Sequence, residues 1–360
     1  MTVIIFVLVL IVLVVVHEFG HFIAAKLLGI KVQEFGVGFP PRLASIKKGE
    51  TRYSLNALPL GGFVKIFGEE GEGDDNERSY ASRSPWQKTL VLLAGVAFNL
   101  LFAFFIFWVA FTIGFPTSVD DAQDSLPVRE SHVQVIDLAS KSPAKEGDLR
   151  RGDIILNVQG PSVGDRVTVG DVATLRKFAD EHRGQTIDIT IQRGDEVLKK
   201  HLLARQAPPE GQGPLGISLA RIGLVSYPWW EAAWQAFLAT VRNAFYVFVG
   251  LFLLIKALFG QGAAIGEVSG PVGIAVMTRD FYLLGIHYFL SFLAIISINL
   301  AVINVLPIPA LDGGRLFFLL IEKLKGSPIA PETENKVNAI GFAFLITLLL
   351  IVTIKDILQL

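Results

Sequence analysis

The chain has 360 residues, of which 52% are hydrophobic and only 18% are charged, whereas soluble domains carry about 25% charged residues. This composition excludes an ordinary soluble enzyme and a disordered chain, and a formal net charge of −1 leaves no basic surface for nucleic acid. Cysteine is absent, so disulfides and thiolate metal sites are excluded, and any metal must bind histidine or carboxylate side chains.

An apolar run extends from residue 2 to about Leu28 and, as a helix, is long enough to cross a bilayer. No lysine or arginine precedes the run, so it lacks the basic region of a secretory signal peptide. We therefore interpret it as a retained transmembrane helix.

A glycine-rich, partly basic loop follows from Gly29 to Pro85. Within it, residues 52–57 and 62–67 are typical of short strands, so a β-hairpin loop is expected here. The acidic stretch 69–77 is expected to be a solvated part of the same loop.

Three later apolar runs are predicted to be membrane helices, at about Trp86–Phe115, Tyr288–Leu320 and Val337–Ile354. The second of these is interrupted by Pro307 and Pro309. The predicted fold is therefore a polytopic α-helical membrane protein with about four transmembrane helices.

A further stretch, Trp229–Phe259, is apolar but carries Glu231, Arg242 and Lys256. It either spans the membrane or lies in the interface as an amphipathic helix. The residues by themselves leave both interpretations open.

Residues 117–227 have ordinary soluble composition and carry both strand and helix signals. Four strands are predicted, over residues 132–138, 153–160, 185–194 and 197–206. Residues 171–182 are typical of a helix with Asp171 as its N-cap. This segment is predicted to be one small α+β domain inserted into the membrane protein.

The orientation follows from the positive-inside rule. Basic residues flank the loop between the first two helices (Lys26, Lys31, Arg42, Lys47, Lys48, Arg83, Lys88), and acidic residues follow the second helix (Asp120, Asp121, Asp124). We expect that loop to be cytoplasmic, with the N-terminus and the inserted domain outside. A second basic loop (Lys323, Lys325, Lys336) is cytoplasmic only if residues 229–259 do not cross.

The sequence His17-Glu18-Phe19-Gly20-His21 is an H-E-x-x-H motif. On a helix, residues four apart share one face, so both imidazoles can bind one Zn²⁺. Glu18 lies beside them and can take a proton from the water that the metal activates. The alternative is a chance match or a structural histidine pair, but ionisable groups inside an apolar span are costly and favour a functional interpretation.

A catalytic zinc needs a third protein ligand and one open position. The remaining histidines lie in the inserted domain or near the outer end of the third run (His132, His182, His201, His287). Asp312 is the acidic residue inside the third run and, in a four-span topology, lies in the cytoplasmic half with His17 and His21. It is the best candidate, although an Asp312 that snorkels or pairs with Arg315 is the alternative.

Residues next to Asp312 suit an active site inside a membrane. Pro307 and Pro309 free backbone carbonyls, and irregular backbone at membrane depth is tolerated where it lines a wet cavity. Asn299 and Asn304 could bind the substrate backbone or an oxyanion, and an ordinary interhelical hydrogen bond is an equal alternative for each.

Three features together resemble the site-2 protease family of intramembrane zinc metalloproteases. They are HEFGH in a first transmembrane helix, NVLPIPALDGG in a late one and a PDZ-like insert between them. The resemblance covers essentially the whole chain and is greatest for the bacterial proteases that regulate sigma factor E, in a form with one PDZ domain rather than two. It implies that His17, His21 and Asp312 bind zinc and that Glu18 is the general base.

The resemblance also implies a substrate site and a topology. Asn304, Pro307 and Pro309 would help to hold the substrate strand. Family members have four transmembrane helices, which favours a membrane-associated helix over residues 228–260.

The β-hairpin loop has a counterpart in the same family. There the loop presents an edge strand to an unwound substrate, which here would include Gly61 and Gly62. A plain cytoplasmic connector is the alternative.

The insert resembles a circularly permuted bacterial PDZ domain. Residues 142–160 match the PDZ signature apart from Asp148, and residues 213–219 are similar to its carboxylate-binding loop and strand. Backbone N–H groups there could hold a peptide C-terminus while the strand augments the sheet (Gly213, Leu215, Gly216, Ile217). A steric filter that blocks bulky ectodomains without binding any tail is an equal alternative.

The predicted organisation has four parts. Residues 1–116 and 261–360 form the two halves of a membrane protease core, residues 117–227 an extracytoplasmic PDZ-like domain, and residues 228–260 a membrane-associated helix. The chain would lie in the bacterial inner membrane, with its active site toward the cytoplasm.

The predicted function is that of a metalloendopeptidase with one Zn²⁺ per chain. It would cleave the transmembrane segments of single-span membrane proteins, such as anti-sigma factors or signal-peptide remnants, after another protease has removed their ectodomains. Its partners would be these substrates, the lipid bilayer and peptide C-termini, with no nucleic acid. The alternatives are a membrane zinc transporter or metal sensor, and a PDZ scaffold with a relict site.

Overall fold

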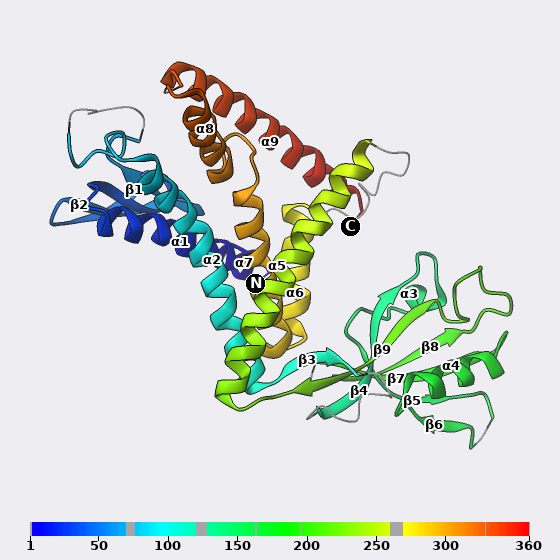
Figure 1. The fold of residues 1–360 in the computed structure, drawn as a ribbon. Helices are drawn as coiled ribbons and strands as arrows, with labels where there is room; N and C mark the ends of the chain where they lie inside the picture. Colours follow the sequence, from blue (N-terminus) through cyan, green and yellow to red (C-terminus); the bar gives the residue numbers. More distant parts are fainter. Residues whose placement is uncertain are drawn as a thin grey trace. The chain divides into compact units, whose positions relative to one another are not determined.

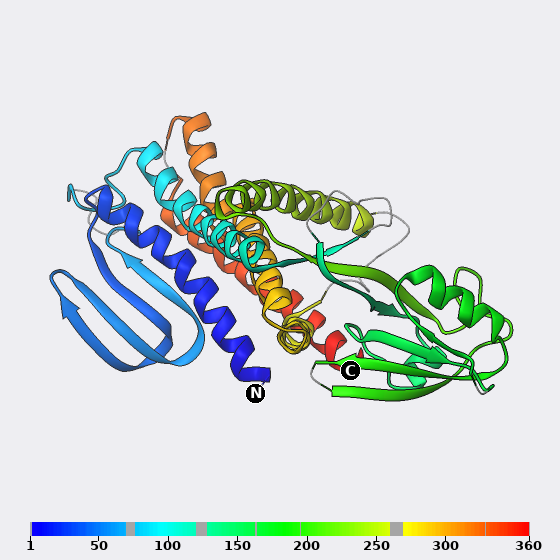
Figure 2. The same cartoon turned by 90° about the horizontal axis from the view of Figure 1, so that it is seen from below.

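The computed structural model describes residues 2–69, 76–119, 128–162, 164–194, 196–259, 269–327 and 329–359. The three aspartates that entered the orientation argument lie outside these residues, as does most of the predicted acidic loop. The chain packs as two units (Figures 1 and 2). The first comprises Met1–Phe107, Gln235–Arg279 and Phe292–Leu360, and the second comprises Trp108–Trp234 and Asp280–Ser291.

Five helices in the described residues contain a stretch long and apolar enough to cross a membrane. They are α1 (Thr2–Leu27), α2 (Pro85–Ile113), α5 (Trp229–Phe259), α7 (Ile286–Val305) and α9 (Pro331–Gln359). The chain is therefore a multi-pass membrane protein, as predicted. The count of about four is not confirmed, because α5, which the sequence left open, also qualifies.

The third predicted membrane run, Tyr288–Leu320, is two helices rather than one interrupted element. Helix α7 ends at Val305, and α8 (Asp312–Lys325) begins after a loop. Two prolines in that loop lack the N–H that a helix interior requires and clash with the preceding turn. Asp312 is therefore the first residue of a helix. A further helix, α6 (Pro271–Leu283), was not predicted.

The predicted β-hairpin loop forms two strands that are much longer than expected. Strands β1 (Val32–Lys48) and β2 (Thr51–Ile66) pair antiparallel in a two-stranded sheet. Both views show the hairpin lying along α1 (Figures 1 and 2). Its base is buried with the end of α1 and with α2 in one apolar cluster (Ala25, Ile30, Val32, Ile66, Val91). This packing holds β2 against the helix that carries the H-E-x-x-H motif.

The inserted segment forms an antiparallel sheet, ordered β3-β9-β4-β5-β7-β8, with β6 paired to β5. Its strands are β3 (Phe115–Ser118), β4 (Val128–Leu138), β5 (Ile154–Gln159), β6 (Arg166–Thr168), β7 (Thr186–Arg193), β8 (Glu196–Leu203) and β9 (Ile217–Val225). The four strands predicted from the sequence are thus confirmed to within a few residues. We refer to this part of the second unit as the sheet domain.

Helix α4 (Val172–Glu181) covers the sheet domain through a stripe of three buried residues, Leu175, Phe178 and Ala179. Spacings of three and four residues put them on one helical face. Asp171 is the N-cap, as predicted, and accepts a hydrogen bond from Thr174 N at 2.6 Å. A short helix, α3 (Pro143–Glu146), is capped in the same way by Ser142.

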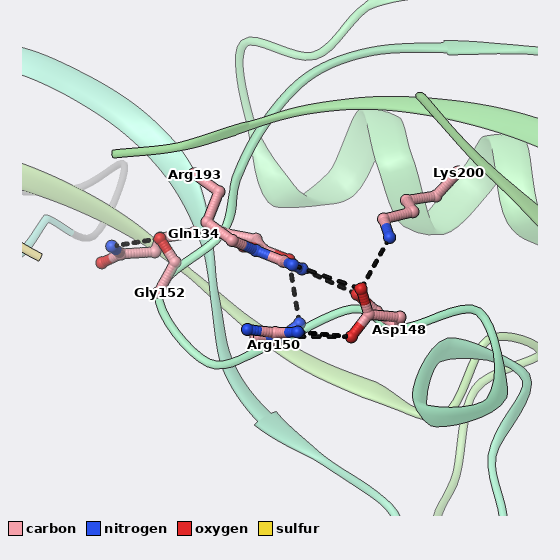
Figure 3. A network of polar contacts seen from close by, with 7 residues as sticks. Gln134, Asp148, Arg150, Gly152, Arg193 and Lys200 are labelled. Atoms are coloured by element: carbon pink, nitrogen blue, oxygen red, sulfur yellow. Dashed lines mark hydrogen bonds and ion pairs between the residues drawn. The ribbon is translucent and has the colours of Figure 1, made fainter. Parts of the chain in front are cut away.

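A network around Asp148 ties the loop before β5 to β7 and β8 (Figure 3). Asp148 has a left-handed φ of 56° and binds Lys200 at 2.8 Å, Arg150 at 3.0 Å and Arg193 at 3.3 Å. Arg193 also binds Asp153, a carboxylate that is only 1% exposed. The hydrogen bond from Lys200 is the main reason why the pKa of Asp148 lies well below its usual range, and it outweighs the effect of burial, which would raise that pKa.

Candidate metal centre

The side chains of His17, His21 and Asp312 converge on one point in the first unit. Nε2 of His17 and Nε2 of His21 lie 3.0 and 3.2 Å from Oδ2 of Asp312, and the two nitrogens are 3.2 Å apart. Both histidines are buried. Helix α1 supplies the two imidazoles, because residues four apart share a face, and the first turn of α8 supplies the carboxylate.

The chemistry of these three groups fits a bound cation. Val91 O lies 2.9 Å from Nδ1 of His21, and because a carbonyl can only accept, Nδ1 carries the hydrogen and Nε2 keeps its lone pair. Oδ2 of Asp312 is buried and has no hydrogen-bond partner within the described part of the chain. Ligand atoms on a tetrahedral zinc with bonds of about 2.0–2.1 Å lie about 3.3 Å apart. Among the described residues, this is the one cluster of metal-binding side chains.

Two glycines allow α1 and α2 to approach closely enough for this arrangement. A Cβ on Gly95 would lie 2.5 Å from Nε2 of His21, and a Cβ on Gly20 would lie 2.4 Å from the carbonyl oxygen of Ala94. Neither distance is sterically possible, so any larger residue would push the helices apart. The imidazole rings therefore rest directly on the backbone of α2.

Glu18 lies in a cavity of about 480 Å³ that the three converging groups also line. Residues from the hairpin, the segment before α2, α2, α8 and α9 complete the wall (Val64, Ile66, Tyr80, Val91, Leu92, Arg315, Asn338, Phe342). A carboxylate next to a metal-binding group, in a cavity open to a substrate, is suited to general acid–base chemistry.

The loop between α7 and α8 is held in an unusual conformation that positions Asp312. Ala310 has a left-handed φ of 74°, and its N–H donates to Oδ1 of Asn338 on α9 at 3.1 Å. A Cβ on Gly313 would lie 2.1 Å from the carbonyl oxygen of Leu306. The first turn of α8 therefore folds back against its own loop, and only glycine fits there.

Arg315 lines the cavity but does not pair with Asp312, which was the alternative explanation of that aspartate. It forms an ion pair with Glu69, at the end of the hairpin. The sequence does not reveal this pair, because the two residues come from distant segments. It also does not reveal Asn338, which has no local motif around it.

The other predicted site residues differ in their surroundings. Pro309 packs on α9, where a Cβ on Gly341 would lie 2.4 Å from Pro309 Cβ. A Cβ on Gly62 would lie 3.8 Å from Cγ of Glu18, so the hairpin passes beside the general-base candidate. Asn304 and Pro307 are not among the residues that line the cavity.

The residues predicted to bind a peptide lie in the sheet domain. Gly213, Leu215, Gly216 and Ile217 line a cavity of about 560 Å³ between α4 and the start of β9. Apolar and charged side chains of α4 and of the turn that follows it form its other wall (Leu175, Arg176, Ala179, Asp180, Arg183).

The chain combines several apolar helices with a buried cluster of two histidines and one carboxylate, and a glutamate lies beside this cluster. This combination is typical of membrane metallohydrolases. Comparison with known proteins narrows this class. The sequence profile of peptidase family M50 matches residues 5–348. The chain therefore belongs to peptidase family M50, and the predicted resemblance to site-2 proteases is confirmed.

Named relatives agree with the family. A relative from Clostridium perfringens, whose name describes a zinc metalloprotease, is 37% identical over 346 residues, covering 96% of this chain and 95% of its own. A similarly named relative from Synechocystis is 35% identical over 365 residues, covering 98% and 93%. Zinc metalloprotease RasP from Oceanobacillus iheyensis is 28% identical over 451 residues, covering 99% and 98%. The predictions of a metalloprotease and of zinc as its metal are confirmed.

Proposed function

We propose that this protein is an intramembrane endopeptidase in which His17, His21 and Asp312 hold one zinc ion and Glu18 is the general base. One observation carries the proposal. The three ligand atoms lie within 4.8 Å of one another in a cavity that Glu18 shares, and the two histidines come from α1, a helix long and apolar enough to cross a membrane.

The proposed mechanism assigns a role to each of these groups. Zinc, when bound, supplies a Lewis acid that polarises the scissile carbonyl and makes water acidic near neutral pH. Glu18 accepts the proton of the attacking water and returns it to the leaving amine. His17, His21 and Asp312 hold the ion and leave one position open for the reaction.

Substrates of the proposed enzyme are single-span membrane proteins. A helical substrate must first unwind, because its carbonyls are otherwise hydrogen-bonded within the helix. Residues 62–66 of β2 pair with β1 on one side, and two of them, Val64 and Ile66, line the catalytic cavity. We propose that an unwound substrate adds as a strand to the other edge of residues 62–66, the edge that does not pair with β1. Asn304, Pro307 and Pro309 would lie on the far side of the substrate.

The groove of the sheet domain supports a PDZ-like role in selecting substrates. Strand β9 pairs with β4 along its length, whereas β3 covers only its second half, Ile222–Val225. The edge of β9 at Ile217–Leu219 therefore faces the groove beside α4 and could accept a peptide C-terminus. A filter that excludes bulky ectodomains is the second candidate, since the domain would precede the active site on the outer side.

The proposed setting is a bacterial inner membrane, with the N-terminus and sheet domain outside and the active site toward the cytoplasm. The basic residues between α1 and α2 support this orientation through the positive-inside rule. Segments 1–116 and 261–360 would then form the membrane core, with 117–227 as the outer domain and 228–260 as a membrane-associated helix between them. Remnant signal peptides and anti-sigma factors, after a first cut by another protease, are the substrates proposed.

A zinc transporter is the principal alternative, and one experiment separates the two. We expect Glu18→Gln to retain zinc and to lose cleavage of a single-span substrate in proteoliposomes, because the amide cannot accept the proton. Zinc content is measured on the purified protein, and Glu231→Gln on α5 is the matched control. Unchanged cleavage by Glu18→Gln would exclude the proposed role of this residue.

A further inference from the structure

A stripe of three residues on α2 contacts the two histidines of the metal centre. Val91, Gly95 and Asn99 are spaced four apart and share one helical face. Val91 O faces Nδ1 of His21, and a Cβ on Gly95 would lie within 2.8 Å of atoms of both rings. Nδ1 of His17 lies 3.3 Å from Nδ2 of Asn99. Each ring therefore has its own partner on α2, on the side away from Asp312.

Asn99 is an unusual residue to find at this depth. Its side chain is completely buried, and its Oδ1 has no hydrogen-bond partner among the described residues. Its backbone oxygen is occupied separately, since it accepts a hydrogen bond from Ser297 Oγ on α7 at 2.8 Å. A buried amide costs free energy unless it is paired, so its contact with His17 calls for a chemical reason.

The chemistry of His17 determines which end of the Asn99 amide must face the ring. If Nε2 binds a metal, its lone pair is in use, and the neutral imidazole carries its hydrogen on Nδ1. The group opposite Nδ1 must then accept. The amide nitrogen and oxygen of asparagine have nearly the same size. A half-turn about the Cβ–Cγ bond therefore exchanges the two atoms without moving any neighbour.

We propose that Asn99 is a positioning residue for the metal centre, with its Oδ1 accepting the hydrogen bond from Nδ1 of His17. This inference rests on the proposed zinc centre. Asn99 would do for His17 what the Val91 carbonyl does for His21. It would select the tautomer that leaves Nε2 free, fix the ring plane and make the ligand more basic.

The competing explanation is that Asn99 only joins α2 to α7. In the structure that connection runs through the backbone oxygen of Asn99 and Ser297 Oγ, and the side chain takes no part in it. A side-chain substitution therefore separates the two roles, because it leaves the link to α7 intact.

The test compares variants that keep or remove an acceptor at position 99 in the full-length protein in detergent. Asn99→Leu has a similar volume and no acceptor, Asn99→Asp keeps an oxygen, and Asn243→Leu on α5 is a matched control. The zinc dissociation constant is measured by competition with a chelator at constant pH. The absorption spectrum of the cobalt-substituted protein reports the ligand geometry.

We expect Asn99→Leu to bind zinc about 10- to 100-fold more weakly and to alter the cobalt spectrum. Asn99→Asp should bind at least as tightly as the wild type, and Asn243→Leu should be unchanged. The melting temperature of each metal-free variant controls for folding. If Asn99→Leu does not fold, Asn99→Ala takes its place as the variant without an acceptor.

Two results would overturn the inference. One is wild-type zinc affinity in the variant without an acceptor, and the other is an equal loss in Asn99→Asp, which would assign a packing role. A separate variant, His17→Ala, tests the zinc centre itself. Full zinc binding by His17→Ala would contradict the proposed function, so the two failures are distinguishable.

Discussion

Ala310, two residues before Asp312, donates a hydrogen bond from its N–H to Oδ1 of Asn338 on α9, 3.1 Å away. Ala310 has a left-handed φ of 74°, which costs a non-glycine residue roughly 1–2 kcal/mol. The hydrogen bond from a different helix holds this conformation. The position of the Asp312 carboxylate in the candidate metal centre therefore depends on α9.

We expect Asn338→Leu to lower the free energy of unfolding by about 1–3 kcal/mol, because it leaves the Ala310 N–H without an acceptor. Zinc binding and cleavage should fall with it, since Asp312 loses its support. Asn338→Asp keeps the acceptor oxygen and should retain most of both. Equal behaviour of the two variants in thermal melting and zinc titration would show that the hydrogen bond does not matter.

Asp312→Ala should abolish stoichiometric zinc binding and cleavage, because two imidazoles alone make an incomplete site. Prolonged treatment with a chelator should give the wild type the same inactive state, reversible on adding zinc. Zinc content and cleavage rate are the measurements. Full activity of Asp312→Ala would exclude it as the third ligand.

Gly95→Ala should weaken zinc binding although it changes no ligand. The added Cβ would lie 2.5 Å from Nε2 of His21, so the ring or the helix must move, at a cost of about 1–3 kcal/mol. Gly250→Ala on α5 is the matched control, because no atom of the described residues lies within 4 Å of its added Cβ. Zinc affinity equal in the two variants would mean that α1 and α2 can separate freely.

The ion pair between Arg315 and Glu69 should contribute to closing the catalytic cavity from the hairpin side. We expect Arg315→Ala and Glu69→Ala each to reduce cleavage and to lower the free energy of unfolding by about 1–3 kcal/mol. The two losses should not add in the double variant, because they remove the same interaction. Fully additive losses in thermal melting would contradict a direct role for the pair.

His182 in the sheet domain predicts a pH dependence of stability. Its Nδ1 faces the Phe178 carbonyl at 2.9 Å and its Nε2 faces Asp165 at 2.5 Å, so only the protonated ring can donate to both acceptors. Burial alone would lower the pKa of His182, but these hydrogen bonds outweigh it and raise the pKa.

Because the folded-state pKa is raised, the stabilisation is complete below the ordinary histidine value of about 6.5. It should be lost as the pH rises through the folded-state pKa. Melting of the full-length protein across this range measures the effect. His182→Gln should flatten the profile, and a profile with the same slope in that variant would assign the dependence to other groups.

Much of the fold was predictable because its signals are local. The apolar run around His17 and the alternating strands of the sheet domain each occupy one continuous segment, so periodicity alone identifies them. The Asp171 cap was predictable for the same reason. The division of the third run into α7 and α8 was missed because two prolines show that a helix is disturbed, but not how far apart its halves lie.

The sequence by itself determined the local part of the candidate metal centre, since the four-residue spacing of His17 and His21 puts both imidazoles on one helical face. It also limited the third ligand to histidine or a carboxylate, because cysteine is absent. Only the tertiary structure decided three contacts. Asp312 lies against both histidines, Asn99 contacts the His17 ring, and Asn338 accepts a hydrogen bond from the loop between α7 and α8. These contacts join distant segments, and no local spacing records the packing of helices that brings them together.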